Sequence, residues 1–211
     1  MEGRVYVESK EEAFRTAMEW PDQTGTVWTD GPRLDSRAVG AALAFKEGDR
    51  WIKRAVYLGK NKEVFDVEVF AILRAAKLLE KRGERGGAYT VFSDSQAAIA
   101  RVQHDGTGPA QALAKAMVAT VNTLVSRDNA FSLRWTPAHR GVEGNEAADE
   151  AARSAVEVEG REVRRGEGVE LDYLREASLS HLTRITTERR SEATSESFVC
   201  NHLYLTCYMG V

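Results

Sequence analysis

Two aspartates of the sequence each end a short run that is typical of a buried strand. Asp30 follows residues 26–29 and Asp94 follows residues 89–93, and both runs are rich in β-branched and aromatic side chains. One such ending is usually a turn-forming aspartate. Two in one small domain indicate that a rigid sheet brings two carboxylates to one place, where they could do chemistry.

Two further acidic residues stand out from the patterns around them. Glu68 lies on the apolar stripe of a predicted helix at 64–82, where a lone glutamate is usually salt-bridged because unpaired carboxylates are rarely buried. Asp149 falls in the predicted first turn of the last helix, which Asn145 is expected to cap, and N–H groups there stabilise a carboxylate. Each position has an ordinary structural explanation when it is taken alone.

The four acids are more informative as a set, because a sheet and its covering helices can bring them together. Like charges repel, so four carboxylates at one point must take up protons or bind cations. Oxygen ligands without clustered Cys or His select Mg²⁺ or Mn²⁺ over zinc. Two such ions about 3.5–4 Å apart can activate a water and stabilise the leaving oxygen of a phosphodiester.

The elements that would hold these acids follow from hydrophobic periodicity. Short connections predict that the first three strong strands form an antiparallel meander, and the strand–helix–strand unit that follows implies a parallel crossover. Residues 5–7 could add one more strand, and Ser9 is expected to cap a short helix. The predicted strands are 25–30, 39–45, 51–58, 88–93 and 131–136, and the predicted helices are 64–82, 95–102, one from Pro109 and one capped by Asn145.

Composition indicates an ordinary globular protein, with 43% hydrophobic and 29% charged residues. The net charge of −3 gives no support to nucleic-acid binding, although basic residues outnumber acidic ones by eight to three between residues 31 and 62. Both cysteines, Cys200 and Cys207, lie in the last twelve residues, which fits a reducing compartment. Neither a signal peptide nor an apolar run of membrane-spanning length is apparent, so we predict an intracellular location in nucleus or cytoplasm, with no membrane.

Four sequence motifs occur in an order that resembles ribonuclease H. The most specific of them is the block from Trp135 to Asp149, WTPAHRGVEGNEAAD, and the other three are TDG at 29–31, FDVE at 65–68 and SDSQ at 93–96. The similarity is greatest to the ribonuclease H domains of non-LTR retrotransposon polyproteins, particularly those of fungal elements. It divides the chain into an N-terminal extension (1–22), the ribonuclease H-like domain (23–156) and a C-terminal linker with a helical tail (157–211).

The resemblance implies an α/β fold with a five-stranded mixed sheet, in which two parallel strands join the antiparallel three and helices flank the sheet. It implies an endonuclease that cuts the RNA strand of RNA/DNA hybrids. The protein is expected to be a monomer, with a reverse transcriptase domain as a possible partner in the parent polyprotein. The implied ligands of two Mg²⁺ ions, for which Mn²⁺ would substitute, are Asp30, Glu68, Asp94 and Asp149. His139 would assist proton transfer or product release, and the implied nucleic-acid contacts are Gly31, Arg33, Ser95, Gln96 and Asn145.

Two departures from the family pattern keep other interpretations open. Pro32 removes a backbone donor beside the expected metal site, and residues 198–211 do not match the segment that follows the domain in fungal elements. A catalytically inactive nucleic-acid-binding relic is therefore the main alternative, and strand transfer on DNA is a third. A zinc site built from His181, Cys200, His202 and Cys207 is disfavoured because the spacing matches no standard motif.

Overall fold

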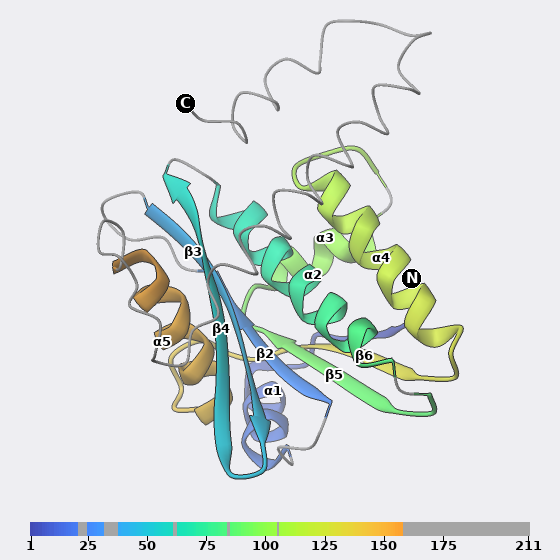
Figure 1. Ribbon diagram of the computed structural model, residues 1–211, viewed down its shortest axis with the longest axis horizontal. Helices are drawn as coiled ribbons and strands as arrows, with labels where there is room; N and C mark the ends of the chain where they lie inside the picture. The colour runs from blue at the N-terminus through green and yellow to red at the C-terminus, as the bar shows by residue number, and fades with distance from the viewer. Residues whose placement is uncertain (21–24, 32–37, 61–62, 84, 105, 158–211) are drawn as a thin grey trace, which may run out of the picture. The chain divides into compact units, whose positions relative to one another are not determined.

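A mixed β-sheet is the centre of the fold in this computed structural model (Figure 1). The structure describes residues 1–20, 25–31, 38–60, 63–83, 85–104 and 106–157, and all of them belong to one compact unit that spans residues 1–169. Within these ranges the sheet has six strands in the order β1-β6-β5-β2-β3-β4. The strands are β1 (Arg4–Tyr6), β2 (Thr26–Asp30), β3 (Ala38–Glu47), β4 (Arg50–Lys60), β5 (Ala88–Ser93) and β6 (Ala130–Trp135).

The pairing of the strands confirms the predicted mixture of directions. β2, β3 and β4 form an antiparallel meander, while β5 joins β2 in parallel and β6 joins β5 in parallel. The expected count of five strands is wrong, because β1 adds a sixth strand parallel to β6. β1 overlaps residues 5–7, which the sequence analysis named as a possible extra strand but left out of the count, because three residues are too few for a clear period-two pattern.

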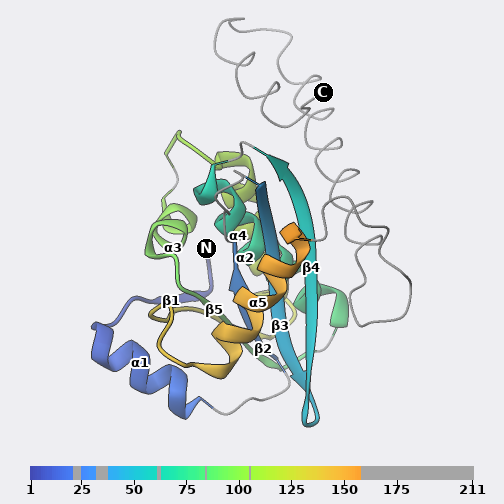
Figure 2. The same ribbon diagram turned by 90° about the vertical axis from the view of Figure 1, so that its left-hand side faces the viewer.

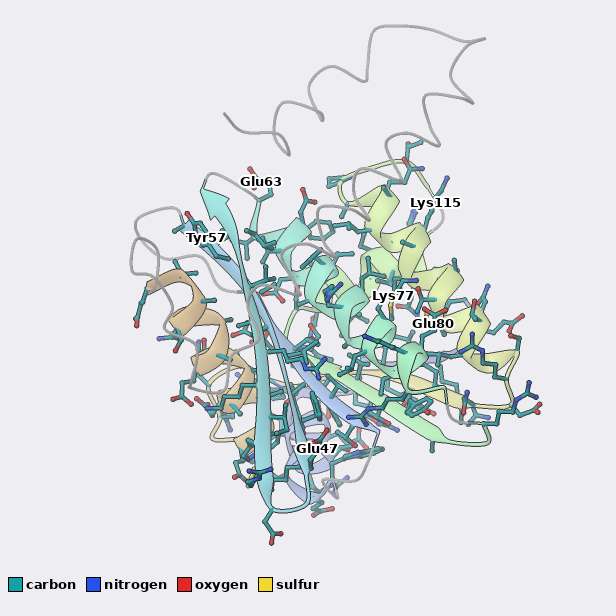
Figure 3. All side chains as sticks on the ribbon, in the orientation of Figure 1. Glu47, Tyr57, Glu63, Lys77, Glu80 and Lys115 are labelled. Atoms are coloured by element: carbon teal, nitrogen blue, oxygen red, sulfur yellow. The ribbon has the colours of Figure 1, made fainter. Side chains whose placement is uncertain are left out.

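Helices cover both faces of the sheet. α2, α3 and α4 pack on one face, and α5 packs on the other (Figure 2). The helices are α1 (Lys10–Glu19), α2 (Val64–Arg82), α3 (Gln96–Gln103), α4 (Gln111–Val125) and α5 (Glu143–Glu157). Ser9 caps α1 through its hydroxyl, as expected. On α2, Lys77 donates to Glu80 at 3.1 Å, one turn along the helix (Figure 3).

The helix starts differ from expectation at two places. α5 begins at Glu143, so Asn145 lies inside its first turn and does not cap it, and Asp149 lies one turn further on. α4 begins at Gln111, because Ala110 takes a left-handed conformation with φ 51° and Pro109 stays outside the helix. Backbone conformations of this kind depend on tertiary packing, which hydrophobic periodicity does not record.

The start of α5 is pressed onto the sheet by close packing against β2. A Cβ added at Gly144 would lie 2.2 Å from Nε1 of Trp28, so only glycine lets the helix approach this closely. Trp28 in turn stacks on Phe92 of β5, with ring centroids 4.1 Å apart. At the β3–β4 end of the sheet, Trp51 Nε1 donates to Glu143 Oε1 at 2.8 Å. The first turn of α5 is therefore fixed from two sides.

Several expectations fall outside the described residues. These are the expected linker and tail at 158–211 with the disfavoured zinc residues, and the expectations for Pro32 and Arg33. In the part of the chain that the structure describes, no helix is both long and apolar enough to cross a bilayer.

Candidate metal centre

The sheet register places the two strand-end aspartates next to each other. β2 and β5 are parallel neighbours, and Thr29 pairs with Ser93, so Asp30 and Asp94 each lie one residue beyond this pair. Asp30 is almost completely buried at the end of a strand whose five residues are all buried. Trp135 Nε1 donates to the main-chain oxygen of Asp94 at 2.9 Å, which fixes the backbone there.

Glu68 reaches the same point from α2. Its side chain is buried, on the face of the helix that packs against the sheet. A Cβ added at Gly31 would lie 3.0 Å from Glu68 N and 3.1 Å from Glu68 Cδ, so the chain after β2 passes very close to α2. The Gly31 N–H donates to Asp30 Oδ1 at 2.7 Å. The TDG motif thus supplies both a carboxylate and the room for a second one.

The structure brings Asp30, Glu68 and Asp94 together, with one carboxylate oxygen of each lying within 4.8 Å of the others. Asp149 on α5 is close enough for a side-chain hydrogen bond with Asp30, and its charge acts on Asp94 as well. We call these four residues the acidic cluster. Four elements, β2, α2, the end of β5 and α5, therefore converge on one point.

The convergence raises the pKa values of three of the four acids. Burial, the charge of Asp94 and a hydrogen bond with Asp149 raise the pKa of Asp30 to about 8. Burial and the charges of Asp30 and Asp94 raise the pKa of Glu68 well above its usual range. Burial also raises the pKa of Asp94, although the charge of His139 and a hydrogen bond with Asn145 act in the opposite direction. Without a cation, burial therefore favours the protonated forms of Asp30, Glu68 and Asp94.

The donor set fits a divalent cation of the Mg²⁺ or Mn²⁺ type. Oε2 of Glu68 is buried and accepts no hydrogen bond from any described residue, although burial of such an atom is costly. Asp30, Glu68 and Asp94 offer only hard oxygen ligands, and these ions prefer such ligands. A cation at this point would neutralise the cluster and satisfy the orphaned oxygen of Glu68.

His139 lies beside Asp149 of the acidic cluster, on the exposed loop that joins β6 to α5. Its imidazole, Glu146 and Asp149 each have a potential ligand atom within 4.8 Å of the others. Arg153 lies one helical turn after Asp149, and its Nε donates to Asp149 Oδ1 at 2.8 Å. The sequence analysis missed Arg153, although an acid and a base four residues apart on a helix are the signal that could have found it.

The residues expected to contact nucleic acid have different environments. Gln96 is exposed at the start of α3, whereas the Ser95 hydroxyl accepts a hydrogen bond from Ala98 N and caps that helix. Asn145 is 2% exposed and its side chain hydrogen-bonds Asp94, so it lies behind the acidic cluster. Gly31 is buried, and Arg33 lies outside the described residues. Contact with nucleic acid stays a prediction for all five.

The close approach at Gly31 gives a testable consequence. We expect Gly31→Ala to destabilise the fold by about 1–3 kcal/mol, because the new methyl group overpacks against Glu68. The displacement of Glu68 should also weaken the binding of Mg²⁺ by about 10- to 100-fold, since changes at residues that support metal ligands have effects of this size. Urea unfolding and calorimetric titration with Mg²⁺ measure the two effects.

Gly48→Ala is the matched control for this variant. Gly48 has a positive φ of 60° but no atom within 4 Å of an added Cβ, so only the backbone cost of about 1 kcal/mol should appear. A Gly31→Ala protein that is as stable as the wild type and binds Mg²⁺ equally well would contradict the proposed packing.

The sequence identifies the family to which this chain belongs. The sequence profile of the RNase H family matches residues 22–157, and the chain belongs to this family. Its α/β fold, with a mixed sheet flanked by helices, is the RNase H-like fold. Among solved structures, the chain is similar to RNase H1 from the halophilic archaeon Halobacterium salinarum NRC-1. The sequence identity is 18% and the TM-score 0.48, over 63% of this chain and 96% of that one. No curated protein matches the chain in sequence.

Proposed function

We propose that this protein is an endoribonuclease that cleaves the RNA strand of RNA/DNA hybrids with two divalent cations. Membership of the RNase H family supports ribonuclease H activity. The observation that carries the finer proposal is the convergence of Asp30, Glu68 and Asp94, with Asp149 within hydrogen-bonding reach of Asp30. This is the arrangement that a phosphodiester-cleaving metal site requires.

Each residue of the site has a distinct role in this proposal. Asp30, Glu68, Asp94 and Asp149 would hold Mg²⁺, for which Mn²⁺ would substitute. The bound ions supply an activated water and stabilisation of the leaving oxygen. His139 is exposed beside Asp149, where its imidazole can exchange a proton with the solvent and with the reacting groups. Arg153 orients the Asp149 carboxylate through the hydrogen bond to Oδ1.

Substrate recognition is proposed from the surface beside the cluster. Gln96 is exposed at the start of α3, directly after Asp94 and Ser95, so it can reach a nucleic-acid strand whose phosphate lies at the metal centre. Gly31 and Asn145 are buried beside the acidic cluster and support its side chains. Discrimination of RNA from DNA at this surface would require contacts to the 2′-hydroxyl. Arg33 would hold phosphates of the same hybrid.

The test is cleavage of a labelled hybrid by the full-length protein in Mg²⁺ and in Mn²⁺. We expect cuts in the RNA strand that leave a 5′-phosphate and a 3′-hydroxyl, and none in a DNA-only duplex of the same sequence. Asp94→Asn should abolish the cuts, and the exposed-site variant Asp49→Asn should leave them unchanged.

Other outcomes separate the alternatives. Binding of the hybrid in EDTA without cleavage in either metal would indicate a catalytically inactive nucleic-acid-binding relic. Cleavage of the DNA-only duplex would indicate strand-transfer chemistry instead.

The motif resemblance further leads us to propose that the domain comes from a retrotransposon polyprotein with a reverse transcriptase domain. We also propose that the protein is intracellular and that it acts as a monomer.

A further inference from the structure

The N-terminal segment, residues 1–20, packs against the sheet that carries the proposed active site. It precedes the residues that match the RNase H family, which begin at 22. Nevertheless Ala13 and Ala17 of α1 are buried, and the Trp20 ring meets Phe92 of β5 edge-on at 5.5 Å. α1 lies on the side of the sheet that α5 also covers (Figure 2).

Both ends of this segment are tied to the sheet through one residue of β6. The Arg134 guanidinium lies 3.8 Å from the Tyr6 ring centroid and 4.8 Å from the Trp20 ring centroid. Its Nη1 also donates to Glu8 Oε1 at 3.1 Å. A single arginine thus contacts β1, Glu8 just before α1 and Trp20 just after it, so α1 is held in place relative to the sheet.

From this position α1 contacts the loop that carries His139, residues 136–142, which we call the His139 loop. The Arg140 guanidinium lies over the Phe14 ring of α1, with Cζ 5.2 Å from the ring centroid. Two residues later, Val142 is buried in a cluster that includes Ala17 of α1 and Ala148 of α5. The contact therefore involves the immediate neighbour of His139.

The His139 loop has a backbone that needs such support. His139 has φ 52° and Gly141 has φ 73°, and a non-glycine residue in this region costs about 1 kcal/mol or more. A conformation of this kind persists only when surrounding contacts determine it. On its α5 side the loop is held by a long hydrogen bond of 3.4 Å from Gly141 N to Glu146 Oε1. On the other side it is held by Phe14.

We propose that α1 is a positioning element for the His139 loop, and that Phe14 is the residue through which it acts. By holding Arg140, the Phe14 ring keeps His139 in its left-handed conformation beside Asp149. Phe14 can hold the His139 loop whether or not the protein has the activity proposed above. An effect of Phe14 on catalysis, however, rests on that proposed activity. The test therefore needs one measurement that involves no catalysis.

Trypsin provides this measurement, because it cleaves after Arg140 when the loop opens. In the full-length protein we compare Phe14→Leu, which keeps an apolar side chain but loses the ring, with Phe14→Tyr, which keeps the ring. We expect the rate of cleavage after Arg140 to rise about two- to fivefold in Phe14→Leu, the factor that corresponds to loss of an exposed cation–π contact. Phe14→Tyr should match the wild type. The control Met18→Leu, at a residue 54% exposed on the same helix, should also match it.

Selectivity and kinetics distinguish positioning from general destabilisation. In Phe14→Leu the rate of tryptic cleavage after Arg74, on α2, should stay at the wild-type value, and kcat for the hybrid should fall about two- to fivefold with KM unchanged. Equal acceleration at Arg74 and Arg140, no acceleration at either, or Phe14→Tyr behaving like Phe14→Leu would overturn the proposal. A wild-type protein that cuts no hybrid would refute the proposed function, and the tryptic comparison alone would then decide the role of Phe14.

Discussion

Asp30→Asn should abolish hybrid cleavage and at the same time make the metal-free protein more stable. Asp30 is the central member of the acidic cluster, since the charges or hydrogen bonds of Asp94 and Asp149 both act on it. Loss of a proposed metal ligand should exceed the 10- to 100-fold effect that is typical of residues that hydrogen-bond to metal ligands, so we expect a rate loss of more than about 100-fold.

The gain in stability has the same origin as the loss of activity. An uncharged amide removes a buried carboxylate that is stable only when protonated, and one unit of pKa shift corresponds to about 1.4 kcal/mol. We therefore expect Asp30→Asn in EDTA at pH 8 to unfold at a higher urea concentration, with a gain of about 2 kcal/mol or more. Asp49→Asn, an exposed aspartate in the β3–β4 turn, is the control and should change neither quantity. An Asp30→Asn protein that still cuts hybrids, or that is less stable than the wild type in EDTA, would contradict the role of Asp30.

The stability of the metal-free protein should decrease as the pH rises from about 4 to about 8. The folded protein holds a proton on Asp30 up to a pKa of about 8, whereas the unfolded chain releases it near the ordinary value of 3.8. A raised acid pKa contributes stability that is fully present below the unfolded pKa and is lost as the pH rises through the folded pKa. Above pH 8 this contribution is gone, and the raised pKa of Glu68 acts in the same direction.

Divalent cations should reverse this loss, and more strongly at pH 8 than at pH 5. At pH 5 Asp30 holds a proton that competes with the metal, whereas at pH 8 Asp30 is half ionised. At ten to a hundred times its Kd, Mg²⁺ should add about 1.4 to 2.7 kcal/mol to the free energy of unfolding. Urea unfolding between pH 5 and 9, with EDTA or Mg²⁺, measures both effects, and Asp30→Asn should flatten the dependence on pH. Wild-type stability that rises between pH 6 and 8 in EDTA, or an equal effect of Mg²⁺ at both pH values, would be inconsistent with the account.

The central strands and the long helix were predictable because their patterns are local. The helix at Val64–Arg82 has the predicted bounds, and the strand at Ala88–Ser93 does as well, since a stripe of apolar side chains or a glycine-bounded run marks each of them. The order of the four acidic motifs was equally visible. Their spatial convergence needed the parallel register of β2 and β5, which the family resemblance supplied and periodicity did not.

The features that prediction missed depend on tertiary contacts. β1 pairs with β6 and its Tyr6 ring contacts Arg134 of that strand, so its place in the sheet depends on residues more than 120 positions away, although residues 5–7 were named as a possible strand. α5 starts two residues before Asn145 because Gly144 packs on the Trp28 ring. The contact of Phe14 with Arg140 joins residues 126 positions apart in the chain, so neither residue alone marked it.

Calorimetric titration of Mg²⁺ into the metal-free protein at pH 7 is the most direct test of the claim that the acidic cluster is a divalent-cation site. Because the pKa of Asp30 is about 8, most molecules carry a proton there at pH 7, and binding must expel it. We expect an apparent binding enthalpy that changes with the ionisation enthalpy of the buffer, which reports release of at least part of a proton, and no such signal in Asp30→Asn. Binding without proton release, or no saturable binding at millimolar Mg²⁺, would contradict a divalent-cation site at the acidic cluster.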